Sequence, residues 1–141
     1  MASYREYLIC QPYFTDWQLN PFSIYNMKTG KHKKFKVQTM DFRLDGYKLY
    51  YVNWLSGPTS LYDNPGLYEG IRYDIRTGDR DVMFGGIEMS DGFFTDTDLY
   101  YTKLFWNPDP GESSYYHYSI GTGQTNQISE SEYYLKRDEI K

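Results

Sequence analysis

The residue types most often used in catalysis are sparse in this chain. It holds two histidines, His32 and His117, and one cysteine, Cys10. No spacing of His and Cys fits a zinc site, and the histidines fall in different repeat units, so a shared metal site is not expected. The stretch "GTGQTNQ" (121–127) is typical of a hairpin and not of a phosphate-binding strand-to-helix turn. We therefore expect no catalytic set, no metal site and no cofactor.

Two aspartates, Asp41 and Asp91, occupy matching positions in a repeated pattern described below. We expect both to lie on innermost strands that line a channel. Such carboxylates could bind a cation, but hydrogen bonding to backbone or water is the favoured alternative. Paired carboxylates also cleave glycosidic bonds, so a carboxylate-dependent hydrolase stays open as an alternative to a non-catalytic protein.

Three longer stretches, 15–22, 56–70 and 106–114, gather aromatic, acidic and turn-forming residues. Each contains Asn-Pro, which punctuates turns, and binding residues concentrate on loops that a rigid scaffold holds. Aromatic rings would be stacking platforms, with acids and amides as hydrogen-bonding groups; the alternative is that the aromatics only cap the sheets. The expected ligand-binding residues are Trp17, Tyr62, Asp63, Asn64, Tyr68, Trp106, Asn107 and Asp109.

Composition limits the scaffold and its partners. A chain of 141 residues, 40% hydrophobic and 24% charged, is one globular domain, and 17 tyrosines favour β-strands. A net charge of −4 argues against general nucleic-acid binding. The cluster "KHKKFK" (31–36) could touch an anion, although the solvated face of an edge strand is the favoured interpretation.

The lone cysteine and the terminal sequence bear on location. One cysteine cannot form an intrachain disulfide, which suits a reducing compartment, and the N-terminus lacks the apolar segment of a signal peptide. No apolar run approaches transmembrane length. We expect a cytoplasmic protein without membrane association.

An internal repeat organises the chain. A tyrosine followed by Thr-Gly recurs in "IYNMKTG", "RYDIRTG" and "HYSIGTG", and the Thr-Gly pairs lie 48 and then 45 residues apart (29, 77 and 122). A Leu-Tyr-Tyr element recurs at 49 and 99. Aromatic and polar residues alternate around these motifs, which indicates half-buried strands joined by hairpin turns.

Each period contains four short strands, A to D, and a period of ~40–50 residues with four strands is the signature of a propeller blade. The sequence therefore predicts an all-β propeller fold of three four-stranded blades in a single domain, 1–141. The expected strands are B–D of the first blade at 4–14, 22–29 and 32–39; A–D of the second at 40–45, 47–56, 69–77 and 80–86; A–D of the third at 87–95, 98–106, 115–122 and 124–129; and a last A strand at 131–140.

These segments resemble the Tyr-rich blades of bacterial propellers of the TolB-like and YWTD-like kind, in which "Y-x-x-x-x-T-G" closes the C–D hairpin. The resemblance covers nearly the whole chain and implies architecture, with little information about function. The chain differs from WD-repeat proteins, because it lacks both Trp-Asp and Gly-His.

The two ends of the chain are expected to share a blade. The first blade (4–39) lacks an A strand, and 131–140 resembles one, with Leu135 matching Phe42 inside a sheet and Lys136 matching Arg43 toward the channel. Closed propellers have 4–8 blades, so we expect a homodimer that closes six blades through the terminal strands. The alternative is that the sequence simply stops there.

The resulting functional hypothesis is a non-catalytic binding protein that uses the long-loop face for a small molecule or glycan. A protein-interaction module or inhibitor, such as a phage or bacterial accessory factor, is the second hypothesis. The hydrolase is the third.

Overall fold

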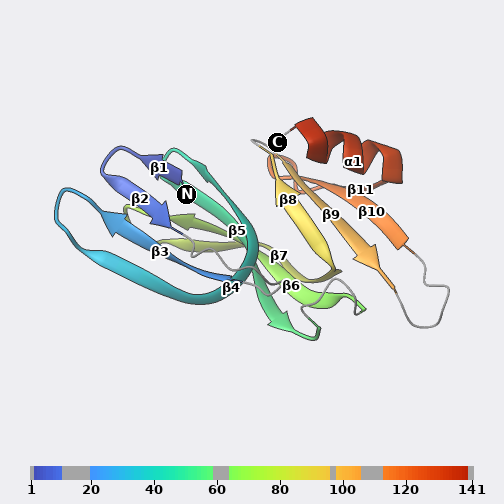
Figure 1. Ribbon diagram of the computed structural model, residues 1–141, viewed down its shortest axis with the longest axis horizontal. Helices are drawn as coiled ribbons and strands as arrows, with labels where there is room; N and C mark the ends of the chain where they lie inside the picture. Colours follow the sequence, from blue (N-terminus) through green and yellow to red (C-terminus); the bar gives the residue numbers. More distant parts are fainter. Residues whose placement is uncertain (1, 11–19, 59–63, 96–97, 106–112, 140–141) are drawn as a thin grey trace.

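The computed structural model describes residues 2–10, 20–58, 64–95, 98–105 and 113–139. Figure 1 shows these residues as antiparallel strands with a single helix near the C-terminus. The elements are β1 (Ala2–Tyr4), β2 (Tyr7–Cys10), β3 (Asn20–Asn26), β4 (His32–Asp45), β5 (Lys48–Ser56), β6 (Gly66–Asp74), β7 (Arg80–Met89), β8 (Asp91–Phe94), β9 (Asp98–Leu104), β10 (Ser113–Ser119), β11 (Thr125–Ile128) and α1 (Glu130–Glu139).

The strands form three four-stranded antiparallel units, so the all-β expectation is confirmed. β1 to β7 are hydrogen-bonded in sequence order, and β8 to β11 form a separate sheet. The pairing register of β4 shifts between Thr39 and Phe42, where its partner changes from β3 to β5. We call β1–β3 with the first half of β4 the first sheet, the second half of β4 with β5–β7 the second sheet, and β8–β11 the third sheet.

The predicted Thr-Gly hairpins form with one recurring set of hydrogen bonds. The hydroxyls of Thr29, Thr77 and Thr122 each accept the backbone N–H two residues further on, at 3.3 Å. The glycines that follow have positive φ angles of 76°, 85° and 73°, a conformation that costs glycine little. The repeat in the sequence thus encodes one turn, used once in each sheet.

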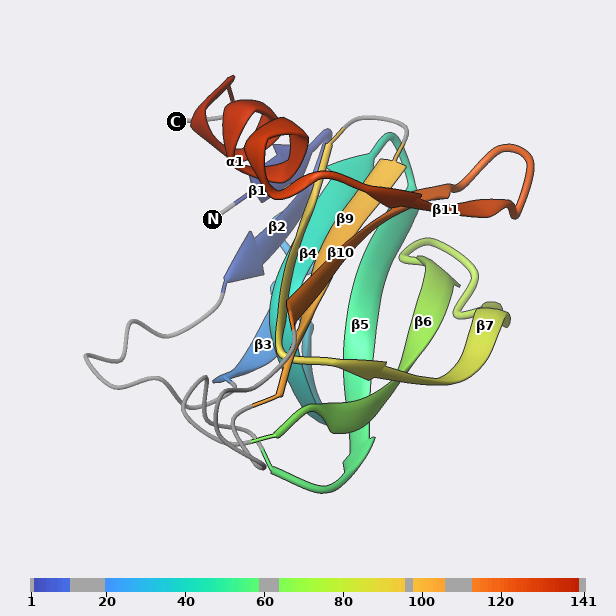
Figure 2. The same cartoon turned by 90° about the vertical axis from the view of Figure 1, so that its right-hand side faces the viewer.

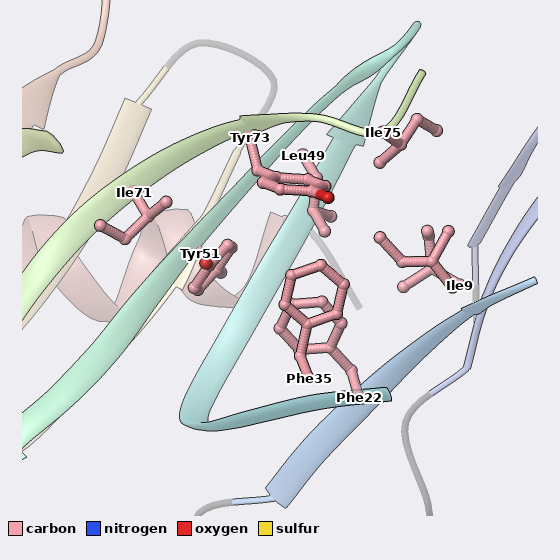
Figure 3. Close-up of a cluster of buried hydrophobic side chains, with 9 residues drawn as sticks. Ile9, Phe22, Phe35, Leu49, Tyr51, Ile71, Tyr73 and Ile75 are labelled. Atoms are coloured by element: carbon pink, nitrogen blue, oxygen red, sulfur yellow. The ribbon is translucent and has the colours of Figure 1, made fainter. Parts of the chain in front are cut away.

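The first core lies between the first and second sheets, as Figure 3 shows. Phe22 of β3 stacks on Phe35 of β4, with 4.7 Å between ring centroids, and Tyr73 of β6 meets Phe35 edge-on at 5.0 Å. Leu49 and Tyr51 project into this core from β5. The tyrosines predicted to form strands therefore also supply much of the core.

Strand alternation fills a second and a third core. In the second core, Val52 of β5 and Tyr68 of β6 face the third sheet. Leu99 and Tyr101 of β9 belong to the same core and come from the third sheet. On the opposite face of β9, Tyr100 belongs to a third core. The second sheet is therefore buried on both faces, because successive side chains of a strand point to opposite sides.

The expectation for the N-terminus was wrong in part. Residues 4–14 were expected to be one strand without an A strand before it, but β1 and β2 form a hairpin in which Tyr4 pairs with Tyr7. Arg5, at the turn, has a φ of 51°. β1 thus supplies the strand that the first sheet was thought to lack, and no second segment is needed to complete it.

The expectation for the C-terminus was also wrong, because residues 130–139 form the helix α1 instead of an A strand. Ser129 caps it: the Ser129 hydroxyl accepts the Glu132 N–H at 3.1 Å. Acidic residues occupy its first turn, and Lys136 and Arg137 its last, which complements the helix dipole. The sequence "SESE" (129–132) carries the capping-box signal Ser-x-x-Glu.

The helix α1 packs on the third sheet, and Figure 1 shows it beside β10 and β11. Tyr133 is fully buried there and lies 5.2 Å from Phe93 and 5.3 Å from Tyr115 between ring centroids. Leu135, expected inside a sheet, is 62% exposed. The segment that was expected to exchange as a strand and close a six-bladed dimer is therefore a helix in this structure. The dimer itself stays a prediction.

Candidate functional site

The strands that flank the three predicted binding loops are well placed to present them together. Because paired strands run antiparallel, the ends flanking these connections lie opposite the Thr-Gly turns of each sheet. Figure 2 shows the C-terminal ends of β5 and β9 in the lower half of the view and the β10–β11 turn at the upper right. Six predicted ligand-binding residues lie outside the described residues: Trp17, Tyr62, Asp63, Trp106, Asn107 and Asp109.

The two remaining predicted residues, Asn64 and Tyr68, differ in exposure. Asn64 is half-buried just before β6, at the loop end of the second sheet. Tyr68 is 1% exposed and packs in the second core, where burial raises the pKa of its hydroxyl to about 12. The prediction of Tyr68 as a stacking platform is therefore wrong in this conformation, because the alternation of β6 points its ring toward the third sheet.

The base of the second connection is narrow and hydrogen-bonded. The Trp54 indole N–H donates to the Gly57 carbonyl at 3.1 Å. Gly57 has a φ of 86°, and a Cβ added at Gly66 would collide with the Pro58 carbonyl oxygen. Both glycines are needed for this close approach. Trp54 is thus a structural residue that holds the start of the loop, a role that the sequence analysis did not assign.

The paired aspartates lie where the innermost strands of the second and third sheets meet. Asp41 of β4 accepts the Phe94 N–H of β8 at 2.8 Å. Asp91 of β8 forms an ion pair of 2.6 Å with Arg137 of α1, and Arg137 also donates to the Tyr133 hydroxyl at 3.4 Å. These bonds connect β4, β8 and α1 in one polar junction, which we call the inner-strand junction.

Electrostatics at the inner-strand junction favour a proton on Asp41. Burial raises the pKa of the Asp41 carboxyl to about 6, the nearby Asp91 carboxylate adds to this, and the backbone N–H bonds and Arg137 oppose it. Burial also raises the pKa of the Tyr133 hydroxyl. The Asp41 carboxyl can therefore gain or lose a proton near pH 6.

The same bonds favour a structural role for the two carboxylates. The alternative in which they bond to backbone agrees with the structure, since Asp41 accepts from Phe94 and Asp91 from the Gly92 N–H at 2.9 Å. Among the described residues, no three His, Cys, Asp or Glu side chains lie close enough to hold a metal ion. Arg137 and Tyr133 were missed as site residues because their i, i+4 spacing matters only on a helix.

The histidines lie on different sheets. His32 of β4 stacks on Tyr25 at 5.3 Å between ring centroids. His117 of β10 stacks on Tyr100 at 4.8 Å, and its Nε2 lies 3.1 Å from an Asp98 carboxylate oxygen. Each histidine thus packs on a tyrosine of the neighbouring strand.

Comparisons with known proteins give one similarity. No family model and no curated protein matches the chain. Among solved structures, the chain is similar to the crystal structure of TolB from Acinetobacter baumannii, with 18% sequence identity and a TM-score of 0.47 over 79% of this chain. The match covers 27% of the TolB chain, so this protein spans little more than a quarter of that length. In the described part of the chain, no helix has the length and apolar character that crossing a membrane requires.

Proposed function

We propose that this protein is a non-catalytic binding protein that uses the loop end of its three sheets. One observation carries the proposal: the strands flanking all three long connections end opposite the Thr-Gly turns of their own sheets. Cys10 and Asn20 flank the first connection, Ser56 and Gly66 the second, and Leu104 and Ser113 the third. A rigid scaffold that gathers loops at one end is a common arrangement for binding sites.

The ligand that best suits the loop sequences is a small molecule or a glycan. Trp17, Tyr62 and Trp106 supply flat rings that combine an apolar face with a polar edge. Asp63, Asn64, Asn107 and Asp109 supply hydrogen-bonding groups for hydroxyls. Tyr68 supports the second loop from within the core and does not contact the ligand in this proposal.

The predicted homodimer and cytoplasmic location remain proposals alongside the binding function. Because 130–139 are helical, a six-sheet ring can no longer use the terminal strand exchange. It would instead require α1 to leave the third sheet, or contacts through other surfaces of the chain.

A glycan array tests the binding proposal. Wild-type protein should bind at least one class of oligosaccharide, and Trp17→Ala with Trp106→Ala should weaken that binding by about tenfold or more, since each ring contributes ~1 kcal/mol or more of contact. Thr29→Ala, in the Thr-Gly turn at the opposite end of the first sheet, is the control and should leave binding unchanged. Equal binding by the double variant and the wild type would contradict the proposal.

A further inference from the structure

A small pocket lies at the opposite end of the molecule from the predicted binding loops, between the first and second sheets. Its volume is about 170 Å³, and it is open to solvent, unlike the enclosed cavity of ~150 Å³ that holds a benzene ring. It opens beside the Thr-Gly turn that joins β3 and β4. The residues that line it are Tyr7, Ile24, Asn26, Lys31, His32, Lys33 and Ile75.

The floor of the pocket is apolar and fixed. Ile24 and Ile75 are 6% and 8% exposed and belong to the first core, and Figure 3 shows Ile75 at the edge of that core. Backbone bonds hold both sides: the Ile75 N–H donates to the Tyr47 carbonyl at 2.9 Å, and the Met27 N–H to the Glu6 carbonyl at 2.6 Å. The apolar floor is therefore present before any ligand arrives.

The rim of the pocket is cationic. Two lysines, Lys31 and Lys33, supply this charge and flank His32 along the chain, and all three residues are exposed. The Lys33 ammonium lies 5.1 Å from the Phe35 ring centroid and 5.4 Å from that of Tyr73, and it donates to the Tyr73 hydroxyl at 3.3 Å. Its side chain thus turns toward the second sheet, on the same face of β4 as Phe35.

No carboxylate belongs to the described residues that line the pocket. The buried carboxylate nearby in sequence, Asp74, accepts the backbone N–H groups of Arg76 and Thr77 at 2.8 and 3.1 Å and pairs with Lys48 at 3.3 Å. Its charge is therefore balanced on the second sheet. The charges of Lys31 and Lys33 therefore give the pocket a positive potential above its apolar floor.

We propose that this pocket binds a small organic carboxylate whose apolar body is about the size of one ring. The ring would rest on Ile24 and Ile75, and the carboxylate would accept hydrogen bonds from the Lys33 and Lys31 ammonium groups. A charge-assisted hydrogen bond of this kind is roughly twice as strong as a neutral one. A neutral ring would use the floor alone, and inorganic phosphate the rim alone. This site is separate from the loop end and does not depend on the function proposed there.

Methyl NMR tests the proposal on the wild-type chain. Protein labelled at isoleucine methyl groups is titrated with benzoate, with benzyl alcohol as the neutral analogue of similar size, and with inorganic phosphate. Benzoate should shift the Ile24 and Ile75 methyl resonances and leave Ile128, in the third core, unchanged. It should bind about tenfold more tightly than benzyl alcohol. Absent shifts, equal affinity for the two rings, or equal binding of phosphate would each overturn the proposal.

Two lysine variants locate the charge that matters. Lys33→Met should weaken benzoate binding by about tenfold. Lys34→Met is the matched control, because it removes the same charge from the neighbouring residue of β4, which points to the opposite face of the first sheet. It should change the affinity less than about twofold. If both variants weaken binding equally, the rim acts only through net charge, and the pocket is not the site.

Discussion

At the scale of single residues, the ionisation of Asp41 should affect stability. Burial raises the pKa of its carboxyl from 3.8 to about 6, so the folded protein binds this proton more tightly than the unfolded chain does. The stabilisation is complete below the unfolded pKa and is lost as the pH rises through about 6. A difference of about two pKa units corresponds to at most ~3 kcal/mol.

Asp41→Asn tests this pH dependence. The asparagine oxygen can still accept the Phe94 N–H but cannot ionise. Wild type should be more resistant to urea at pH 5 than at pH 7.5, and the variant should lose most of that difference. Asp45→Asn, an exposed position on the same strand, should retain it. Identical pH dependence in wild type and Asp41→Asn would show that Asp41 does not titrate as described.

Arg137 connects the C-terminal helix to the inner-strand junction. Replacing it with Met keeps an unbranched apolar side chain but removes the ion pair with Asp91, at a cost of about 1 kcal/mol for a pair that is partly exposed. Amide hydrogen exchange within α1 should then accelerate about fivefold. Lys136→Met is the control, because Lys136 pairs only with Glu139 of the same helix in the described contacts, and exchange should change little. Equal acceleration in both variants would remove the special role of Arg137.

At the scale of elements, Tyr133 is the buried side chain through which α1 packs on the third sheet. Tyr133→Ala removes the ring that contacts Phe93 and Tyr115, and loss of a large buried side chain costs about 3 kcal/mol. Leu135→Ala lies on the exposed side of the same helix and should cost less than about 0.5 kcal/mol. Urea unfolding of the two variants compares them directly. A larger loss from Leu135 than from Tyr133 would support the strand expected from the sequence.

The elements divide into those that the sequence predicts and those that depend on distant contacts. The Thr-Gly turns were predictable, because a threonine acceptor and a glycine with positive φ are local requirements. The helix was missed because the likeness of Leu135 to Phe42 outweighed the capping signal at Ser129. The first hairpin was missed because its turn at Arg5 contains no glycine or asparagine.

Some features of the candidate sites could not be predicted from the sequence, because they depend on contacts between segments that are far apart in the chain. Asp41 and Asp91 were matched by repeat position, but the contact of Arg137 with Asp91 depends on how α1 docks. Tyr68 was placed among the binding residues because it lies within the stretch 56–70, which was expected to be a loop. Its burial depends on which face of β6 packs against the third sheet, which a single chain segment does not reveal.

At the scale of the whole molecule, the six-sheet homodimer and the helix α1 require the same surface of the third sheet. A ring that packs a partner's sheet on the third sheet needs the surface that Tyr133 occupies. The ring hypothesis therefore predicts a mass of twice 16.8 kDa in solution, with more dimer for Tyr133→Ala than for wild type at the same micromolar concentration. Light scattering that gives a monomer for both proteins would remove the ring hypothesis and leave the three-sheet fold unaffected.

The position of a bound ligand shows whether the loop end of the molecule is the binding site. The glycan that binds best on the array should be titrated into uniformly labelled protein and followed by backbone amide NMR. The account predicts shifts at the strand ends Ser56, Gly66 and Ser113, with Gly30, Gly78 and Gly123 of the Thr-Gly turns unchanged. Shifts confined to the three turn glycines, with the strand ends unmoved, would contradict it.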